Sequence, residues 1–355
     1  MKKTIAMCII IVGIVFSAEK KLPGVVFLMI WPGARPTSLG GAFTSIANDA
    51  SATYYNPGGI GNFENTEVTL MHVNWLPGLW QGMYYEFMSV VAPLGKKRGA
   101  IGGNVIYITT GNTDVYGPDG EYIGTYVPFD MALTIDYGYK FNEKLSAGLG
   151  FKFIYSYLVP EWVFKRLPDI GVSRGGTGIT WAFDMGFLYS PFKFLSLGFN
   201  LQNIGPNISY TDTGSSDPIP QMLRTGFSVK PVDNKKIKVL FTGELTKLLV
   251  SMFYDPLDTL SFSQELSFEF SEAWKGMGLE IGLFEMIFLR VGFFEDKYGE
   301  RGGFEKNEEG EIIRWPFTYG VGFHFNNFKF DIGIDENIYS FKTTNRKFSL
   351  SYSFK

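Results

Sequence analysis

The chain has few of the residues that build disulfide-bonded, metal-binding or catalytic sites. Among its 355 residues are one cysteine and two histidines, and only 19% of the residues are charged. A single cysteine excludes a disulfide scaffold and a cysteine-based metal site, and two histidines argue against a catalytic metal centre. No Ser-His-Asp order stands out either, so we expect no metal, no cofactor and no enzymatic activity.

Aromatic residues and glycine, in contrast, are abundant. The chain has 34 Phe, 19 Tyr and 7 Trp, together 17% of the residues, and its 42 Gly exceed the usual ~7%. This composition is too aromatic and too weakly charged for a disordered chain. The formal net charge of −3 gives no reason to expect a nucleic-acid partner. The length allows one large domain or two ordinary ones.

Residues 1–18 have the pattern of a secretory signal peptide. Lys2 and Lys3 precede an uncharged apolar run, Ile5–Phe16, and the residues around Ser17 suit cleavage by a signal peptidase. The alternatives are a buried helix or a membrane anchor, but the run is shorter than the ~20 residues that a spanning helix needs. Cys8 lies inside this run, so the exported, mature chain is predicted to lack cysteine.

Beyond this segment no apolar run is long enough for a transmembrane helix, and the dominant period is two. Because successive strand side chains point to opposite faces, each alternating stretch predicts a strand with one apolar face and one small or polar face. The clearest apolar series are Phe129, Met131, Leu133, Ile135, Tyr137 and Tyr139, then Ile179, Trp181, Phe183, Met185, Phe187 and Tyr189, and finally Phe348, Leu350, Tyr352 and Phe354.

A membrane barrel explains this alternation better than a soluble sandwich. The polar positions are mostly Gly, Ser, Thr, Asn and Asp, and aromatic residues gather near the strand ends. A bilayer forbids open sheet edges, so the sheet must close on itself. We predict an all-β, transmembrane antiparallel barrel of fourteen strands, at residues 66–75, 83–92, 99–108, 129–140, 145–158, 177–190, 195–203, 221–230, 237–248, 279–284, 287–295, 316–325, 328–335 and 346–355.

The predicted connections alternate between short and long, as periplasmic turns and extracellular loops do in such barrels. The long ones are residues 109–128, 159–176, 204–220, 249–278 and 296–315. This arrangement places both chain termini on the periplasmic side. Residues 258–276 suit either an extra strand pair or an amphipathic helix, and we favour a loop that carries a short helix.

Four polar side chains fall on the lumen side of their strands: Lys152, Asp184, Arg290 and His324. His324 lies between two phenylalanines, without an obvious catalytic partner in sequence. We interpret it as a lumen histidine bonded to its neighbours.

Residues 27–63 depart from the strand pattern and carry a motif punctuated by glycine. It contains Gly33-Ala34-Arg35, Gly40-Gly41-Ala42, Asn48-Asp49-Ala50-Ser51-Ala52-Thr53 and Asn56-Pro57-Gly58-Gly59. A second motif follows later, Gly278-Leu279-Glu280 and then Phe288-Leu289-Arg290-Val291-Gly292-Phe293-Phe294. In both motifs the chain resembles the PorV/PorQ family of outer-membrane barrels, within the wider group that includes the fatty-acid channel FadL. It departs from the family pattern at Asn48, Gly58 and Lys355.

The resemblance implies that residues 19–63 form a plug, or hatch, inside a barrel of residues 64–355. The plug residues that the motif marks are Arg35, Gly40, Gly41, Asp49, Ser51, Asn56 and Pro57. We expect the plug to enter the barrel from the periplasmic side, with a helical turn in residues 45–52 that stops before Pro57.

The two charged plug residues carry a more specific expectation. We expect Arg35 or Asp49 to pair with lumen charges such as Arg290, Asp184 or Lys152. The alternative for Asp49 is a simple helix cap or an exposed turn residue.

The resemblance implies a role in type IX protein secretion, in which the barrel receives a cargo protein or passes it to the attachment machinery. The fold supports almost as well a FadL-like passive channel for hydrophobic small molecules such as fatty acids. A purely structural barrel is a third possibility. The expected surroundings are the lipid of the outer membrane, together with a secreted cargo protein, the secretion machinery or a hydrophobic molecule.

Overall fold

The computed structural model describes residues 22–95, 98–166, 175–211, 215–250, 252–253, 260–296, 305–306, 308–309, 312–314, 316–336 and 343–354. The predicted signal peptide, residues 1–18, lies outside the described residues. None of the helices in the described part of the chain is long and apolar enough to cross a membrane.

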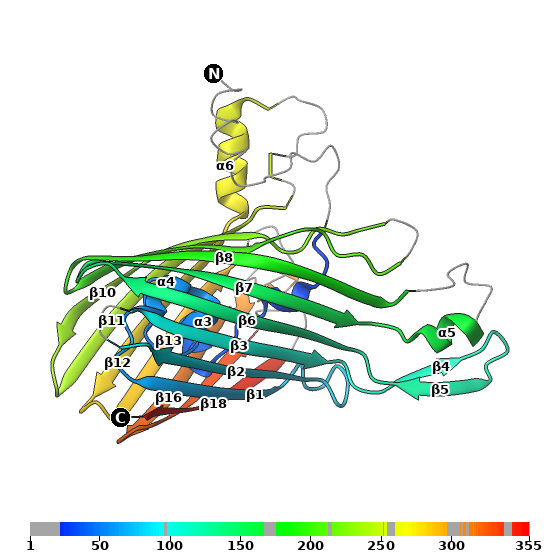
Figure 1. Cartoon of the computed structure of the whole chain (residues 1–355), viewed down its shortest axis with the longest axis horizontal. Helices are drawn as coiled ribbons and strands as arrows, with labels where there is room; N and C mark the ends of the chain where they lie inside the picture. Colours follow the sequence, from blue (N-terminus) through cyan, green and yellow to red (C-terminus); the bar gives the residue numbers. More distant parts are fainter. Residues whose placement is uncertain are drawn as a thin grey trace.

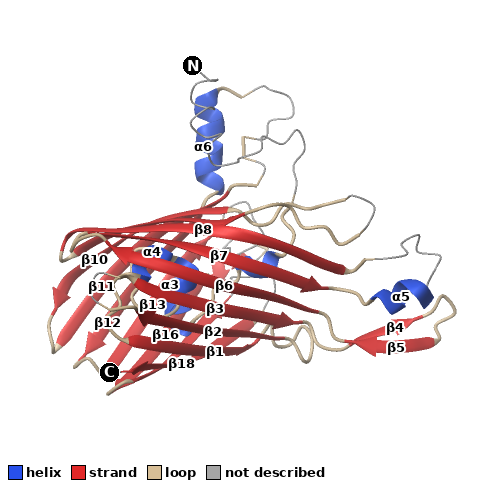
Figure 2. Ribbon diagram, in the orientation of Figure 1, coloured by secondary structure: helices blue, strands red, loops and turns tan. Residues whose placement is uncertain are grey.

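Within the described residues, fourteen antiparallel strands form one closed barrel, as the alternation predicted (Figures 1 and 2). The strands pair in chain order, and the first closes the barrel against the last. They are β1 (Thr66–Asn74), β2 (Tyr84–Pro93), β3 (Ala100–Thr109), β6 (Phe129–Lys140), β7 (Leu145–Tyr157), β8 (Thr177–Phe192), β9 (Leu195–Ile204), β10 (Met222–Asp233), β11 (Ile237–Leu248), β12 (Trp274–Leu283), β13 (Ile287–Glu295), β16 (Phe317–Phe325), β17 (Phe328–Glu336) and β18 (Thr344–Phe354).

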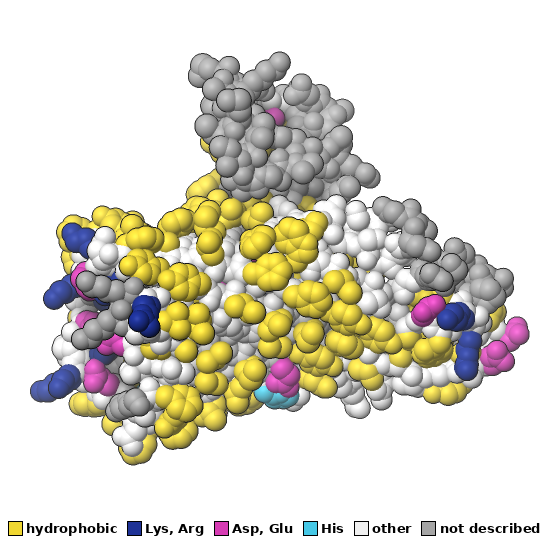
Figure 3. Space-filling view, in the orientation of Figure 1, with side chains coloured by type: hydrophobic (Ala, Val, Ile, Leu, Met, Phe, Trp, Pro, Cys, Tyr) yellow, Lys and Arg dark blue, Asp and Glu magenta, His cyan; other side chains and the backbone are white. Residues whose placement is uncertain are grey.

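The strands turn their apolar side outward. In β6, Leu133 and Ile135 are exposed, whereas Thr134 and Asp136 are buried on the lumen side. The space-filling view shows a wall covered largely by hydrophobic side chains, with charged ones gathered towards the ends of the barrel (Figure 3). This is the reverse of a soluble protein and suits a wall that faces lipid.

One end of the barrel has short turns and the other has long connections that contain elements of their own. The long connections hold the hairpins β4 (Thr113–Tyr116) with β5 (Tyr122–Tyr126) and β14 (Glu305–Lys306) with β15 (Ile312–Arg314), and the helices α5 (Glu161–Arg166) and α6 (Phe262–Glu272). The predicted short helix in residues 258–276 is confirmed as α6, which begins with a capping box at Ser261 and Gln264. However, β12 begins five residues earlier than predicted, directly after this helix.

The N-terminal residues 22–63, called the plug below, lie inside the barrel (Figure 2). The plug contains only single turns of helix: η2 (Val26–Met29), α2 (Ala34–Ser38), α3 (Ala52–Tyr55) and α4 (Pro57–Ile60). The predicted helical turn at 45–52 is wrong, because the turn begins only at Ala52. Pro57 does not simply stop a helix but starts the next one, since the Asn56 side chain accepts a hydrogen bond from Gly58 N.

The first described residues of the plug lie at the long-loop end of the lumen, which corrects the expectation that both ends of the chain lie on the periplasmic side. Gly24 N donates to Pro218 O at 2.9 Å, and Pro218 belongs to the long connection between β9 and β10. From there the apolar segment 25–31 packs against lumen-facing side chains such as Val73 and Ile106 near that end. The chain then crosses the lumen and leaves at the short-turn end, where β1 begins. The C-terminal strand β18 ends at the short-turn end, where the sequence analysis had placed both termini.

Candidate functional site

The wall of the lumen is lined with glycines where the plug backbone lies against it. A Cβ atom on Gly292 would lie 2.2 Å from Gly40 N, and one on Gly333 would lie 2.3 Å from Ala34 O. Such distances are too short for any side chain, so the plug backbone packs directly on the strand backbone. Wall glycines in similar contact with the plug are Gly138, Gly148, Gly186, Gly198, Gly276, Gly278 and Gly320.

The two motif glycines Gly40 and Gly41 are needed for a second reason. Their φ angles are +66° and +75°, in the left-handed region that favours glycine. A Cβ on Gly41 would also lie 2.5 Å from the ring of Trp31. Gly58 stands where the family has alanine. Lack of space explains this difference, because a Cβ there would lie 2.8 Å from Gly186 O.

The plug has little secondary structure, so polar side chains of the wall satisfy its backbone groups. Glu244 Oε2 accepts from Phe43 N and Thr44 N, both at 2.9 Å. Further wall side chains bonded to plug backbone are Gln202, Asn200, Thr242, Thr318, Ser349, Lys347 and Glu67. Much of the polar lining of the lumen is therefore occupied in holding the plug.

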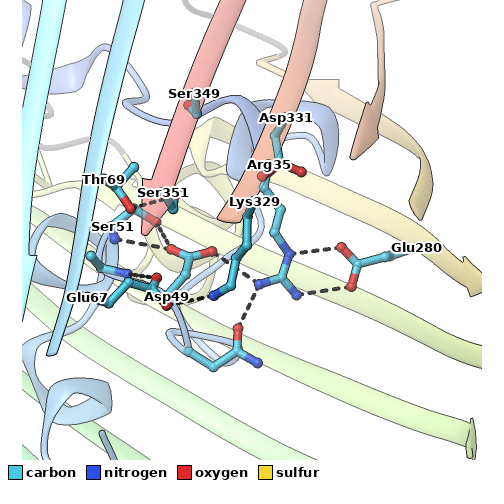
Figure 4. Close-up of polar contacts among 12 residues, drawn as sticks. Arg35, Asp49, Ser51, Glu67, Thr69, Glu280, Lys329, Asp331, Ser349 and Ser351 are labelled. Carbon is cyan, nitrogen blue, oxygen red and sulfur yellow. Dashed lines mark hydrogen bonds and ion pairs between the residues drawn. The ribbon is translucent and has the colours of Figure 1, made fainter. Parts of the chain in front are cut away.

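Arg35 ties the plug to the wall through the carboxylate of Glu280 and also binds Asp49 within the plug (Figure 4). Its guanidinium binds Glu280 on β12 with two parallel hydrogen bonds, at 2.8 and 3.0 Å, and Asp49 of the plug at 3.1 Å. Glu280 in turn accepts from Arg290 Nε at 2.6 Å, and Arg290 donates to Asp331 at 2.6 Å. These five residues, called the Arg35 network below, alternate in charge across three strands.

The direct partner of Arg35 on the wall is thus Glu280 and not one of the predicted lumen charges. Arg290 is reached only through Glu280. Asn48, which departs from the family motif, accepts from Arg35 at 2.7 Å. Burial by itself lowers the pKa of the Arg35 guanidinium, but the charge and hydrogen bonds of Glu280 outweigh it and, with Asp49, raise the pKa above its usual value. Arg35 therefore stays charged in the lumen.

A second buried ion pair lies beside the plug. Arg224 on β10 donates to Glu244 on β11 at 2.6 Å, and both side chains are only 3% exposed. Arg224 also donates to Gly41 O at 2.9 Å, and its guanidinium lies 4.8 Å from the ring centre of Tyr55. The pair therefore bonds both a plug carbonyl and two plug amides.

The remaining motif residues hold the turns of the plug in place. Asp49 Oδ1 accepts from Ser51 N at 3.1 Å and from the Ser51 hydroxyl, which shapes the chain just before α3. Asp49 is therefore both a turn residue and a partner of Arg35. Asn56 donates to Thr44 O within the plug and to Phe187 O on β8, at 2.8 and 2.9 Å, and Pro57 follows it in α4.

The predicted lumen residues Lys152, Asp184, Arg290 and His324 lie inside the barrel but do not form one site. Lys152 and Asp184 pair with each other at 3.1 Å, and Asn203 bonds both. His324 stacks on Phe288, with ring centres 4.2 Å apart, and its Nε2 lies 3.7 Å from Asp331. Among the described residues no group of three or more His, Cys, Asp or Glu side chains is placed to hold a metal ion.

A polar pocket of about 430 Å³ opens at the short-turn end, on the underside of the plug. Its lining combines plug residues such as Asn48 and Asn62 with wall residues such as Ser190, Ser228 and Lys230. At the other end of the plug the lumen is filled by apolar side chains, of which Phe27, Leu28 and Trp31 come from the plug and are buried. The plug thus presents a polar face to one end of the barrel and packs an apolar core towards the other.

The geometry defines a class of protein: a fourteen-strand barrel of the outer-membrane type with an N-terminal plug in its lumen. The fold is similar to the P. putida toluene transporter TodX, with a TM-score of 0.54 and 12% identity over 91% of this chain and 98% of that one. It is also similar to the monoaromatic hydrocarbon channel CymD, with a TM-score of 0.50 and 13% identity over 94% and 99% of the two chains. No curated protein is a significant match.

The sequence itself matches the family of the type IX secretion system protein PorV over residues 19–255. The chain belongs to this family. The match covers the described plug and the strands as far as β11, and so includes the Arg224–Glu244 pair and four of the nine wall glycines named above. The family is that of a secretion system protein, whereas the similar solved structures show a shared fold.

Proposed function

We propose that this barrel acts in protein secretion, as an accessory of a type IX-like system that holds a cargo protein or a machinery protein at its long-loop end. The observation that carries the proposal is the family match together with a lumen packed with the plug. A barrel whose polar lining is bonded to its own N-terminal segment is suited to be a platform. Its surface, and not its interior, meets the secreted protein.

The helix α6 supports a binding role for the long-loop end. It stands away from the barrel wall, and Lys247 on β11 anchors its base by pairing with Glu269 at 2.5 Å and Glu272 at 3.0 Å (Figure 1). Along the helix Phe262, Leu266 and Phe270 follow one another at four-residue spacing and are 42%, 52% and 61% exposed. An apolar stripe of this kind is a common anchor for a partner protein.

The alternative is a passive channel for hydrophobic small molecules. The fold it shares with TodX and CymD favours this function, as does the apolar character of the long-loop half of the lumen. Such a channel needs a continuous apolar path between plug and wall. In this chain Phe27 and Leu28 fill that half of the lumen, so the plug would have to move before a molecule could pass.

Replacing residues 252–272 by a short Gly-Ser linker should abolish capture of secreted proteins while the barrel still folds. The change removes α6 and its apolar stripe but leaves β11 and β12 complete. The measurement is the amount of secreted protein that co-purifies with the tagged barrel from native membranes, by quantitative mass spectrometry. The matched control shortens another long loop by removing the β4–β5 hairpin.

Equal capture by the wild type, the loop replacement and the control would argue against a platform at α6. If the gene deletion left secretion unchanged and instead reduced uptake of long-chain fatty acids or toluene, the channel alternative would replace the proposal. A deletion with neither effect would favour the purely structural role.

A further inference from the structure

An apolar groove of about 480 Å³ lies on the outer wall over β18, β1 and β2, where the barrel closes. Five apolar residues that line it from the outer face are 39–49% exposed, so the groove opens outward and not into the lumen. They are Leu70, Met88, Phe330, Phe348 and Leu350. The strands below are paired without a gap over this stretch, with Leu70 opposite both Met88 and Leu350.

One end of this groove carries an acid–base pair. His72 Nδ1 lies 2.6 Å from Glu86 Oε1, and the two residues face each other across β1 and β2. Their side chains are 51% and 41% exposed, on a face whose neighbours are Leu70, Met88 and Phe348. In Figure 3 a histidine beside an acidic side chain interrupts the hydrophobic wall. A carboxylate on the lipid face of a barrel is destabilising in proportion to its depth, so this pair needs an explanation.

The aromatic residues around the pair indicate its depth in the membrane. Glu86 is opposite Tyr107 on β3, and Tyr107 stacks on Phe129 with ring centres 5.5 Å apart. Tyr84 and Tyr155 extend this row on either side. Such aromatic girdles lie at the level of the lipid head groups. The polar pair is thus at head-group depth, and the groove runs from it towards the middle of the barrel.

The charge of the pair indicates which head group fits. With a neutral imidazole, the Nδ1–H donates to one carboxylate oxygen and the pair carries a net charge of −1. The second carboxylate oxygen can still accept a hydrogen bond. The complement is a cationic N–H donor, because an anionic phosphate or carboxylate would be repelled.

We propose that this groove binds one membrane lipid whose head group carries an ammonium group. The ammonium group donates to Glu86, and an acyl chain lies along Leu70, Met88 and Leu350. We expect a lipid in this groove because every strand around it turns an apolar face to the bilayer. The proposal is independent of the secretion role.

The test uses the full barrel purified from nanodiscs that contain equal amounts of phosphatidylethanolamine and phosphatidylglycerol. Native mass spectrometry of the wild type should show one retained phosphatidylethanolamine. Glu86→Gln keeps the shape of the side chain but removes its charge, and it should reduce the preference for phosphatidylethanolamine by about tenfold or more. Leu350→Trp fills the groove and should reduce retention of both lipids.

The matched control is Glu143→Gln, which removes an acid from another exposed pair, Lys140–Glu143, in a short turn away from the groove. All variants change only outward-facing or turn side chains, so plug contacts such as Gly33 N to Met71 Sδ behind the groove are kept. Equal retention of the two lipids by the wild type, or a preference that Glu86→Gln leaves unchanged, would overturn the proposal. Retention of a protein in place of lipid at this position would overturn it as well.

Discussion

A valine in place of Gly292 should leave the barrel intact but prevent the plug from seating against β13. The added Cβ would lie 2.2 Å from Gly40 N and 2.3 Å from Thr318 Oγ1, the hydroxyl that accepts from the same Gly40 N–H. The first contact is a backbone atom and the second belongs to a fully buried side chain. Valine also favours a strand, so the wall itself should tolerate the change.

The measurement is ion conductance in planar bilayers. We expect closed membranes with the wild type and steady open steps with Gly292→Val, because a displaced plug frees the lumen of a fourteen-strand barrel. Val291→Leu is the matched control, since it enlarges the adjacent, outward-facing residue and should conduct no more than the wild type. A closed Gly292→Val barrel would mean that the plug does not depend on this glycine contact.

Replacing Glu244 by leucine should destabilise the protein by about 3–5 kcal/mol, the usual cost of removing one partner of a buried ion pair. The change leaves Arg224 buried without its carboxylate and removes the acceptor of Phe43 N and Thr44 N. The plug is therefore loosened at the same time as the wall. Denaturant unfolding of the protein in detergent micelles, followed by the gel shift of the folded barrel, measures the loss.

Two further variants separate the ion pair from the plug bonds. Arg224→Met combined with Glu244→Leu removes both charges and should be less destabilised than Glu244→Leu alone. Glu285→Leu breaks the exposed Lys238–Glu285 pair, whose side chains are 39% and 49% exposed, and should leave the stability nearly unchanged. A Glu244→Leu variant as stable as this surface control would refute the holding role of the pair.

The barrel was predictable from the sequence because its signal is local. Alternation of apolar and small residues along each strand, as in residues 129–140, places every side chain inside or outside without reference to the rest of the chain. The predicted start of β12 was too late. In its first residues, from Trp274 on, apolar and polar side chains do not alternate clearly, because two of the positions are glycine. Helix α6 was predictable from its apolar spacing, although its exact bounds were not.

The plug was recognised from its motif, but its path and partners were not predictable. The entry from the long-loop end depends on where the segment 25–31 finds apolar partners, which only the closed barrel determines. Glu280 was missed as the partner of Arg35, although it alternates with Leu279 and Ile281 and so belongs to the lumen face. The alternation could also have identified Arg224 and Glu244 as lumen residues. Which of these charges contacts the plug depends on how the plug is positioned along the wall. No local sequence pattern predicts that position.

We expect the plug to stay seated while the barrel serves secretion. A disulfide between Ala42→Cys in the plug and Gly276→Cys on β12 would lock it in place. A Cβ on Gly276 would lie 3.5 Å from Ala42 Cβ, within the range of disulfides, but also 2.6 Å from the backbone oxygen of Gly40. The single Gly276→Cys variant therefore has to show first that the plug still seats with this side chain present. The mature chain is predicted to have no other cysteine that could compete for the bond.

The deciding measurement is the amount of secreted protein in the medium of cells that carry the locked barrel in place of the wild type. Quantitative proteomics with and without a reductant compares the two states, and gel mobility verifies the disulfide. The single Ala42→Cys and Gly276→Cys variants are the controls. A platform predicts the same secretion whether the plug is locked or released. Secretion that stops when the disulfide forms and returns on reduction would contradict the account, because it would show that the lumen itself must open.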